Sequence, residues 1–202
     1  MSNKPETAEM KISDFIEENI PLNDEERQFL DECIPIRNFP KGTVLLEEGE
    51  VARDSYFVIG GFVRSYHYVD GDDRTTAFFV EGDAVASLTS YVGQKPADHY
   101  FACVEDSTLA VLNYHREIEL YKRFPKFEAL CRLQMEEEFG KQQQRLAKFL
   151  TQSPEERYVD LLKTHPDLAQ RVPQYHLASY LGVKPESLSR IRKRISDKGS
   201  AS

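Results

Sequence analysis

The amino-acid sequence predicts an α+β fold: an N-terminal double-stranded β-roll, then a long helix, then a C-terminal helix-turn-helix. Three observations predict it. Glycines separate short apolar segments between residues 34 and 113, an apolar stripe at helical spacing runs from 127 to 149, and a glycine joins two short amphipathic segments within 174–193. The corresponding domains are a β-roll domain with N-terminal helices (1–124), a long dimerisation helix (125–152) and a helix-turn-helix domain (153–202).

Turn residues punctuate the predicted roll, with glycines at Gly42, Gly49, Gly60, Gly61, Gly71 and Gly82. The apolar run 55–59 ends at a glycine pair, 62–69 follows, and residues 70–73 supply a hairpin turn in which Gly71 can adopt a positive φ. Alternation along 62–69 predicts one packed face and one aromatic, partly polar face. Strands this closely spaced favour a roll or barrel.

Helix-capping signals flank the roll. Asn23 and Glu26 form a predicted capping box for a helix over 23–33, after a shorter helix over 12–19. Pro125 stands near the start of a helix that we expect to reach about Thr151. A new helix then begins at Ser153-Pro154, with Glu156 completing a second capping box.

The long helix carries a nearly continuous apolar stripe: Phe127, Cys131, Met135, Phe139, Gln142, Leu146 and Phe149. This stripe could pack on the roll, or it could form the seam of a helix pair at a dimer axis, with Gln142 as a polar seam residue. The length of the helix favours the second interpretation.

The strongest pattern lies in residues 174–193. Leu177 and Leu181 form the inward face of a first helix, and Ala178 is small where a second helix must cross closely. Gly182 permits a left-handed turn. The shared core is completed by Val183, Leu188 and Ile191. This arrangement is typical of a helix-turn-helix.

Charge is segregated along the chain. The net charge of −8 argues at first against a nucleic-acid partner, yet residues 157–202 contain nine Lys or Arg against four Asp or Glu, a balance of +5 that leaves −13 on residues 1–156. Such asymmetry favours a DNA-binding module attached to an acidic body, although a few like charges can also form a solvated face.

The candidate DNA-binding residues are Lys184, Glu186, Ser187, Ser189, Arg190, Arg192, Lys193 and Arg194. Arg190 can present a bidentate fork to guanine, Glu186 can accept from cytosine, and Ser187 can bond to a base or a phosphate. Lys184 at the helix N-cap opposes the helix dipole, which a bound phosphate would explain. The basic residues from 192 to 194 are expected to contact phosphates.

Several segments resemble one family: Lys41-Gly42-Thr43, Glu48-Gly49-Glu50, 56–63, Phe79 through Gly82-Asp83, Leu181-Gly182-Val183 and 186–190. Together with the order of the parts, they resemble the cyclic-AMP receptor protein (Crp/Fnr) family of bacterial transcription regulators over nearly the whole chain. The resemblance implies a cyclic-nucleotide-binding-like jelly roll, a helix-turn-helix of the winged-helix type, a homodimer formed by the long helix, and double-stranded DNA as partner. It places Glu186, Ser187 and Arg190 at the base-reading positions. RNA polymerase is a further candidate partner.

The resemblance fails where a cyclic nucleotide would bind. Members that bind one hold the ribose with a Gly-Glu pair and the phosphate with a later Arg, whereas this chain has Ala86-Ser87 and no Arg in 94–98. We therefore expect an unknown small-molecule effector, or none, instead of cyclic AMP. Ala86, Ser87 and Lys95 mark the candidate effector pocket, although Lys95 could also be an ordinary exposed turn lysine.

Other chemistries find little support. The cysteines Cys33, Cys103 and Cys131 cannot supply the four thiolates of an iron-sulfur cluster, and they fit reduced core thiols. His67 and His99 are each too isolated to indicate a haem site, and no His-x-His indicates a cupin enzyme. We expect no catalytic residue, metal or cofactor.

The segment 2–9 is polar, and no stretch of about eighteen apolar residues occurs, so we expect a cytoplasmic protein without membrane contact. The rival interpretation is a ligand-binding or protein-interaction module whose C-terminal domain does not bind DNA. Salt-dependent retention on DNA would separate the two.

Overall fold

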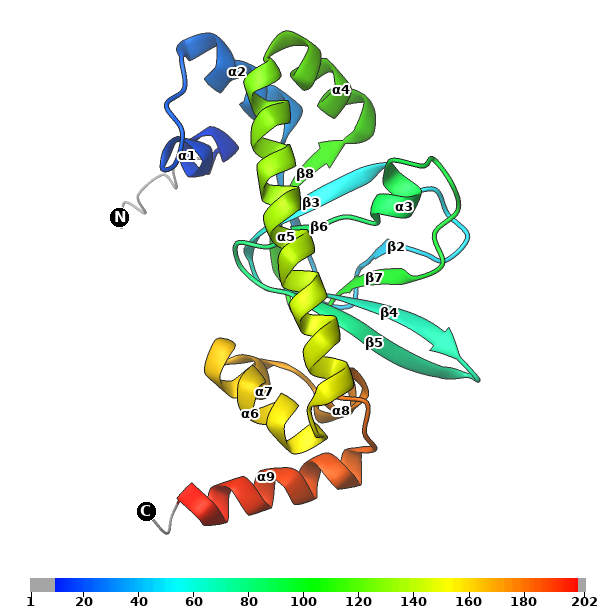
Figure 1. Cartoon of the computed structure of the whole chain (residues 1–202). Helices are drawn as coiled ribbons and strands as arrows, with labels where there is room; N and C mark the ends of the chain where they lie inside the picture. Colours follow the sequence, from blue (N-terminus) through cyan, green and yellow to red (C-terminus); the bar gives the residue numbers. More distant parts are fainter. Residues whose placement is uncertain (1–9, 200–202) are drawn as a thin grey trace, which may run out of the picture. The chain divides into compact units, whose positions relative to one another are not determined.

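A computed structural model describes residues 10–199 (Figure 1). Those residues form two compact units. The first comprises the described residues up to Val63 together with Phe79–Cys131, and the second comprises Arg64–Phe78 together with the described residues from Arg132 onward.

Helices and strands follow in the order α1 (Ile12–Glu17), α2 (Asp24–Cys33), β1 (Ile36–Phe39), β2 (Val44–Leu46), β3 (Asp54–Gly60), β4 (Val63–Val69), β5 (Asp72–Phe79), β6 (Ala84–Val85), α3 (Leu88–Tyr91), β7 (Tyr100–Cys103), β8 (Ser107–Asn113), α4 (Tyr114–Arg123), α5 (Pro125–Thr151), α6 (Pro154–Thr164), α7 (Leu168–Arg171), α8 (Gln174–Tyr180) and α9 (Pro185–Gly199).

The strands form two four-stranded sheets, with orders β1-β8-β3-β6 and β2-β7-β4-β5. In the first sheet β8 pairs antiparallel with both β1 and β3, so Ala110 is opposite Ile36 on one side and Phe57 on the other. In the second sheet the pairing of β2 with β7 is interrupted by a register shift between Val44 and Leu46. The predicted roll of short strands is confirmed.

The first unit has two apolar clusters. One lies among the strands and includes Leu46, Val58, Val85, Phe101 and Leu109. The other joins the helices around the first turns of α5, and Figure 1 shows α1, α2 and α4 gathered there. Burial of these side chains is the main favourable contribution to folding of the unit.

The capping boxes form as the sequence predicts. The Glu26 amide donates to Asn23 Oδ1 at 2.9 Å, and the Asn23 amide donates to Glu26 Oε2 at 3.0 Å. At α6 the Ser153 hydroxyl accepts from the Glu156 amide, and the Glu156 carboxylate accepts from the Ser153 amide. Each box satisfies two backbone donors at a helix start, which fixes where the helix begins.

The expected alternation of faces along 62–69 is wrong for its first half. All residues from Phe62 to Tyr66 are buried. Arg64 lies over the ring of Tyr66 and donates a hydrogen bond to His176 of α8. At Arg64 the face predicted to be aromatic and partly polar is therefore covered, within the second unit, by a helix more than one hundred residues later in the chain.

The apolar stripe of the 27-residue helix α5 divides into two parts. Phe127 is buried with α1, α2 and α4, and Cys131 is half-buried. From Met135 onward the stripe is exposed, with Phe139 at 65% and Leu146 at 61%. Only the first turns of α5 therefore bury the stripe among the described residues.

The cysteines are all free thiols, and Cys33 and Cys103 are buried as expected. Burial raises the pKa of both thiols. No helix within residues 10–199 is both long and apolar enough to cross a bilayer.

Candidate nucleic-acid interface

The helices α8 and α9 pack against each other through a small apolar core. Leu177, Ala178 and Leu188 are completely buried, and Leu181 and Ile191 nearly so. These are the positions that the sequence pattern assigned to the core, and only Val183 is less covered, at half-buried. The core fixes α9 to α8 and leaves the opposite side of α9 in solvent.

The turn between them depends on Gly182, whose φ of +69° lies in the left-handed region. A Cβ at this position would also come within 3.4 Å of the Phe149 ring. The Val183 amide donates to the Ala178 carbonyl at 3.0 Å, closing the turn, and the amides of Ser187 and Leu188 donate to the Lys184 carbonyl. Lys184 is therefore the residue that precedes the first turn of α9, as predicted.

Most of the candidate DNA-binding residues are exposed on α9 or directly before it: Lys184, Glu186, Ser189, Arg190, Lys193 and Arg194. Ser187 and Arg192 are half-buried at the borders of the core. Spacings of four and three residues put Glu186, Arg190 and Lys193 on one face, opposite the buried leucine and isoleucine. The structure thus brings these three together on a polar face.

Four of the candidates already have partners within the chain, namely Ser187, Ser189, Arg190 and Arg194. Arg190 Nη2 donates to Ser187 Oγ at 3.2 Å, which tethers the guanidinium to its own helix. Ser189 Oγ donates to the Pro185 carbonyl at 3.1 Å. Arg194 is 3.2 Å from a carboxylate oxygen of Glu155 in α6. Lys193 has no hydrogen bond or ion pair within residues 10–199, so the candidates differ in how readily they can turn to another ligand.

A polar cluster that no sequence pattern indicated joins the β4–β5 hairpin to α8 within the second unit. Arg64 Nη2 is 2.6 Å from Asp73 Oδ2, and Arg64 Nη1 is 2.8 Å from His176 Nδ1. The Thr75 amide donates to Ser179 Oγ at 2.9 Å. Next to these bonds the rings of Phe78 and Tyr180 are in contact. Because its members are 112 residues apart, no local pattern could reveal the cluster.

The chemistry of arginine fixes the state of His176. A guanidinium has donors and no acceptor, so Nδ1 must accept and the proton of the neutral ring is on Nε2. Burial, together with the positive charge of Arg64, lowers the pKa of His176 to about 4, against an opposing effect of Asp73. The 3.7 Å approach of His176 to Asp73 is therefore no ion pair at neutral pH.

Arg157 of α6 is another residue that no sequence motif indicated. In the sequence it contributed only to the positive charge of residues 157–202. Its guanidinium donates to the carbonyls of Phe149, Gln152 and Leu181 at 3.1, 2.7 and 2.7 Å. It also lies over the Phe149 ring, 4.6 Å from the centroid.

The predicted effector residues flank α3 in the first unit. Ala86 is half-buried, Ser87 is buried and Lys95 is exposed. The buried Ser87 hydroxyl has no hydrogen-bond partner among the described residues. Backbone bonds tie the following loop to the turn before β3, since the Gly49 amide donates to the Ala97 carbonyl and the Ala97 amide to that of Glu50.

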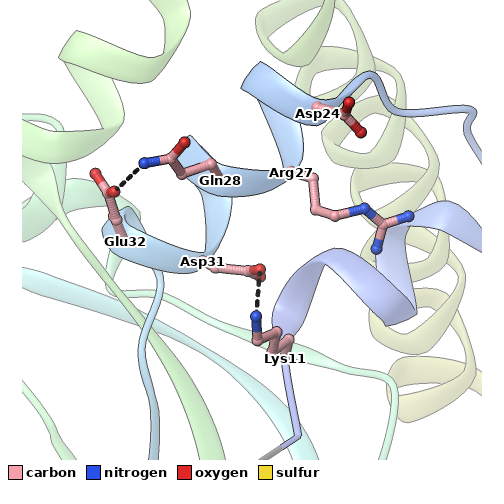
Figure 2. Close-up of a pocket in the computed structure, with 6 residues that line it drawn as sticks. All are labelled: Lys11, Asp24, Arg27, Gln28, Asp31 and Glu32. Carbon is pink, nitrogen blue, oxygen red and sulfur yellow. Dashed lines mark hydrogen bonds and ion pairs between the residues drawn. The ribbon is translucent and has the colours of Figure 1, made fainter.

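A separate open pocket of about 370 Å³ lies between α1 and α2 (Figure 2). Its lining residues are Lys11, Asp24, Arg27, Gln28, Asp31 and Glu32. Arg27 is paired with Asp14 and Glu17, and Lys11 is 3.8 Å from Asp31. These cations are neutralised locally, so the pocket offers no surplus positive charge to a phosphate. Within residues 10–199 no cluster of three or more His, Cys, Asp or Glu is arranged to hold a metal ion.

Comparison with known proteins assigns the roll to a family of domains. Residues 36–124 match the cyclic nucleotide-binding domain. This domain covers β1 to α4 and includes the candidate effector residues. A search of curated protein sequences finds no significant match.

Solved structures share the fold of nearly the whole chain. The c-di-GMP-responsive global regulator CLP of Xanthomonas campestris aligns with a TM-score of 0.67 at 19% identity, over 88% of this chain and 93% of that one. FixK2 of Bradyrhizobium japonicum gives 0.68 at 17% identity, over 82% and 86%. A CooA mutant of Carboxydothermus hydrogenoformans gives 0.65 at 14% identity, over 91% and 84%. The chain thus has the β-roll fold of the cyclic nucleotide-binding domain, with a long helix after it.

Proposed function

We propose that the protein is a DNA-binding transcription regulator that dimerises through α5 and reads an approximately palindromic operator with α9. One observation carries this proposal: α9 buries one side against α8 after a left-handed glycine turn and presents Glu186, Arg190 and Lys193 on the other. A helix held this way can enter the major groove of B-DNA.

Each exposed side chain has a chemical role in this proposal. Arg190 would release Ser187 and bond to guanine, while Glu186 would accept from cytosine. Lys193 and Arg192 would contact phosphates, and Arg194 would do so by leaving Glu155. Ser189 is the weakest candidate because its hydroxyl donates within the helix. Lys184, beside the unsatisfied amides at the start of α9, would face a backbone phosphate.

The exposed part of the α5 stripe supports a homodimer. Met135, Phe139, Leu146 and Leu150 recur on one side of the helix and are 37% to 74% exposed. Apolar side chains at this spacing are typical of a helix that packs against a partner helix, and Gln142 would be the polar residue that sets their register. The two α9 helices would then meet successive major grooves about 34 Å apart.

The roll is proposed to sense an effector other than cyclic AMP, or none. Exposed Lys95 is a point charge without the bidentate geometry of an arginine, and the loop that carries it is tied back by the Ala97 hydrogen bonds. Ser87 is too short to replace a glutamate that holds a ribose. RNA polymerase remains a candidate partner of such a regulator.

The test is selection from a randomised duplex pool by the purified, ligand-free protein at two salt concentrations. Arg190→Ala is the reading variant, and Arg53→Ala, which removes an exposed positive charge from the first unit, is its matched control. We expect the wild type and Arg53→Ala to enrich the same inverted repeat. Arg190→Ala should lose preference at one base pair of each half-site, at a cost of about 1–3 kcal/mol.

Two results would count against the proposal. Enrichment of a single unrepeated half-site would contradict dimeric reading. No enrichment by the wild type, with or without cell extract as a source of effector, would favour a ligand-binding or protein-interaction module whose C-terminal helices do not bind DNA.

A further inference from the structure

We infer that Arg157 is a positioning residue that sets the orientation of the α8–α9 pair on the end of α5 and thereby the spacing of the two DNA half-sites. The inference rests on the proposed function, in which α5 defines the dimer axis and α9 reads the operator. It assigns to Arg157 a role in specificity although this side chain is not on the reading face.

The contacts of Arg157 join three segments of the second unit. Nη1 donates to the carbonyls of Phe149, in the last turn of α5, and of Gln152, directly after that helix. Nη2 donates to the carbonyl of Leu181, the residue that ends α8. The side chain itself comes from α6, so one guanidinium connects the end of α5 to the turn that precedes α9.

These acceptors are the carbonyls that helix ends leave without intrahelical partners, and they carry the negative end of the helix dipole. A cation is favoured there, and a planar group with several donors can serve all three at once. Lysine, with a compact ammonium, lacks this geometry. The residue type is therefore matched to the task of holding two helix ends at a fixed angle.

Packing reinforces the same junction. The guanidinium lies over the Phe149 ring, and a Cβ built on Gly182 would be 3.4 Å from that ring and 3.7 Å from Arg157 Nη2. Arg157 Nε is buried without a partner among the described residues, so the group is held by backbone carbonyls and a ring, with no carboxylate. Nearby, Asp160 accepts from Lys148 and Gln152, which ties α5 to α6 but does not reach the turn.

A small rotation at this junction would displace the far end of α9 by a distance that matters for DNA recognition. The 15-residue helix α9 is about 22 Å long at 1.5 Å per residue. A rotation of about 10° at its start moves the far end by roughly 4 Å, about the rise of one base pair. A looser junction should therefore weaken the preference for one spacing between the two half-sites while leaving the affinity for each half-site nearly unchanged.

The first measurement uses operators that carry the selected inverted repeat with spacers shortened or lengthened by single base pairs, plus an isolated half-site. We expect wild type to prefer one spacer by about tenfold or more. Arg157→Gln, which retains too few donors for three carbonyls, should reduce that preference to about twofold and change half-site affinity by less than about threefold. Arg157→Lys should fall between them, and Lys163→Gln, at an exposed cation of the same helix, should match wild type.

The second measurement needs no DNA. In hydrogen–deuterium exchange of the free protein, Arg157→Gln should accelerate the amides of Gln152, Gly182 and Val183 by about tenfold while amides inside α9 keep their protection. A purely structural role would instead speed exchange throughout the unit.

The outcomes separate the two proposals. If wild type selects no inverted repeat but the exchange effect is local, the proposed DNA reading fails and the positioning role of Arg157 at the junction stands. If wild type prefers one spacer and Arg157→Gln keeps that preference, the inference is overturned while the proposed function stands. If amide exchange in Arg157→Gln is unchanged, or is faster throughout the unit, the inference about Arg157 is overturned whatever the DNA selection shows.

Discussion

The neutral state of His176 predicts a specific pH dependence of stability. In the folded chain its ring accepts from Arg64 and is buried against the hairpin, and its pKa is lowered from 6.5 to about 4. The groups that face it are Arg64, Asp73 and the adjoining ring of Tyr175. Protonation would put a second positive charge beside the guanidinium, so the charged ring favours unfolding.

The size of the effect follows from the two pKa values. Below about pH 6.5 the unfolded chain binds a proton at His176, whereas the folded chain does not until about pH 4, so stability falls as the pH is lowered through this window. One pKa unit corresponds to about 1.4 kcal/mol, which gives a loss of about 3 kcal/mol between neutral pH and about pH 4.

The assay is urea unfolding at a series of pH values, together with an NMR titration of the histidine rings. His176→Gln keeps an acceptor for Arg64 without a titrating ring, so its free energy of unfolding should lack this part of the pH dependence. His165→Gln removes a partly exposed histidine of the same unit and is the matched control. A His176 ring that titrates near 6.5, or pH profiles that coincide for the two variants, would refute the reasoning.

Three further predictions concern backbone, cap and interface. Gly182→Ala should lower the free energy of unfolding by about 1–2 kcal/mol because residue 182 has a positive φ. Gly140→Ala, at a helical position with open space around it, should raise the free energy of unfolding by about 0.5–1 kcal/mol. Urea titration measures both changes, and equal effects of the two substitutions would contradict the strain argument. Ser153→Ala should lower the free energy of unfolding by about 1 kcal/mol because α6 loses its N-terminal cap, and this loss should appear as a lower midpoint of thermal unfolding. Phe139→Lys should weaken dimerisation by at least about tenfold in sedimentation equilibrium, while Leu133→Lys, at a leucine off the stripe that is 56% exposed, should not.

Local patterns made much of the fold predictable. The capping boxes at Asn23 and Ser153 depend on residues three positions apart, and the turn at Gly182 depends on one backbone angle that glycine tolerates. The buried leucines of α8 and α9 follow from helical periodicity in the same way. In each case the partners are close in sequence, so the pattern itself contains the contact.

What the sequence could not supply are the contacts between distant segments. Nothing in the strand that contains Arg64 indicates His176, and no motif marks Arg157 as a ligand of three carbonyls. The apolar residues of the α5 stripe recur at the same helical spacing along the whole helix, yet Phe127 is buried and Phe139 is exposed. Periodicity gives the direction of a side chain but not what covers it.

The membership of Arg64–Phe78 in the second unit has a consequence for how such a protein can evolve. The chain passes between the two units at residues 63–64, 78–79 and 131–132, so the C-terminal unit does not correspond to one continuous stretch of coding sequence. A gene fusion that transferred residues from Arg132 onward to another sensor would leave His176 and Ser179 without their hairpin partners. Recombination should therefore preserve function only when the hairpin and the C-terminal helices are inherited together.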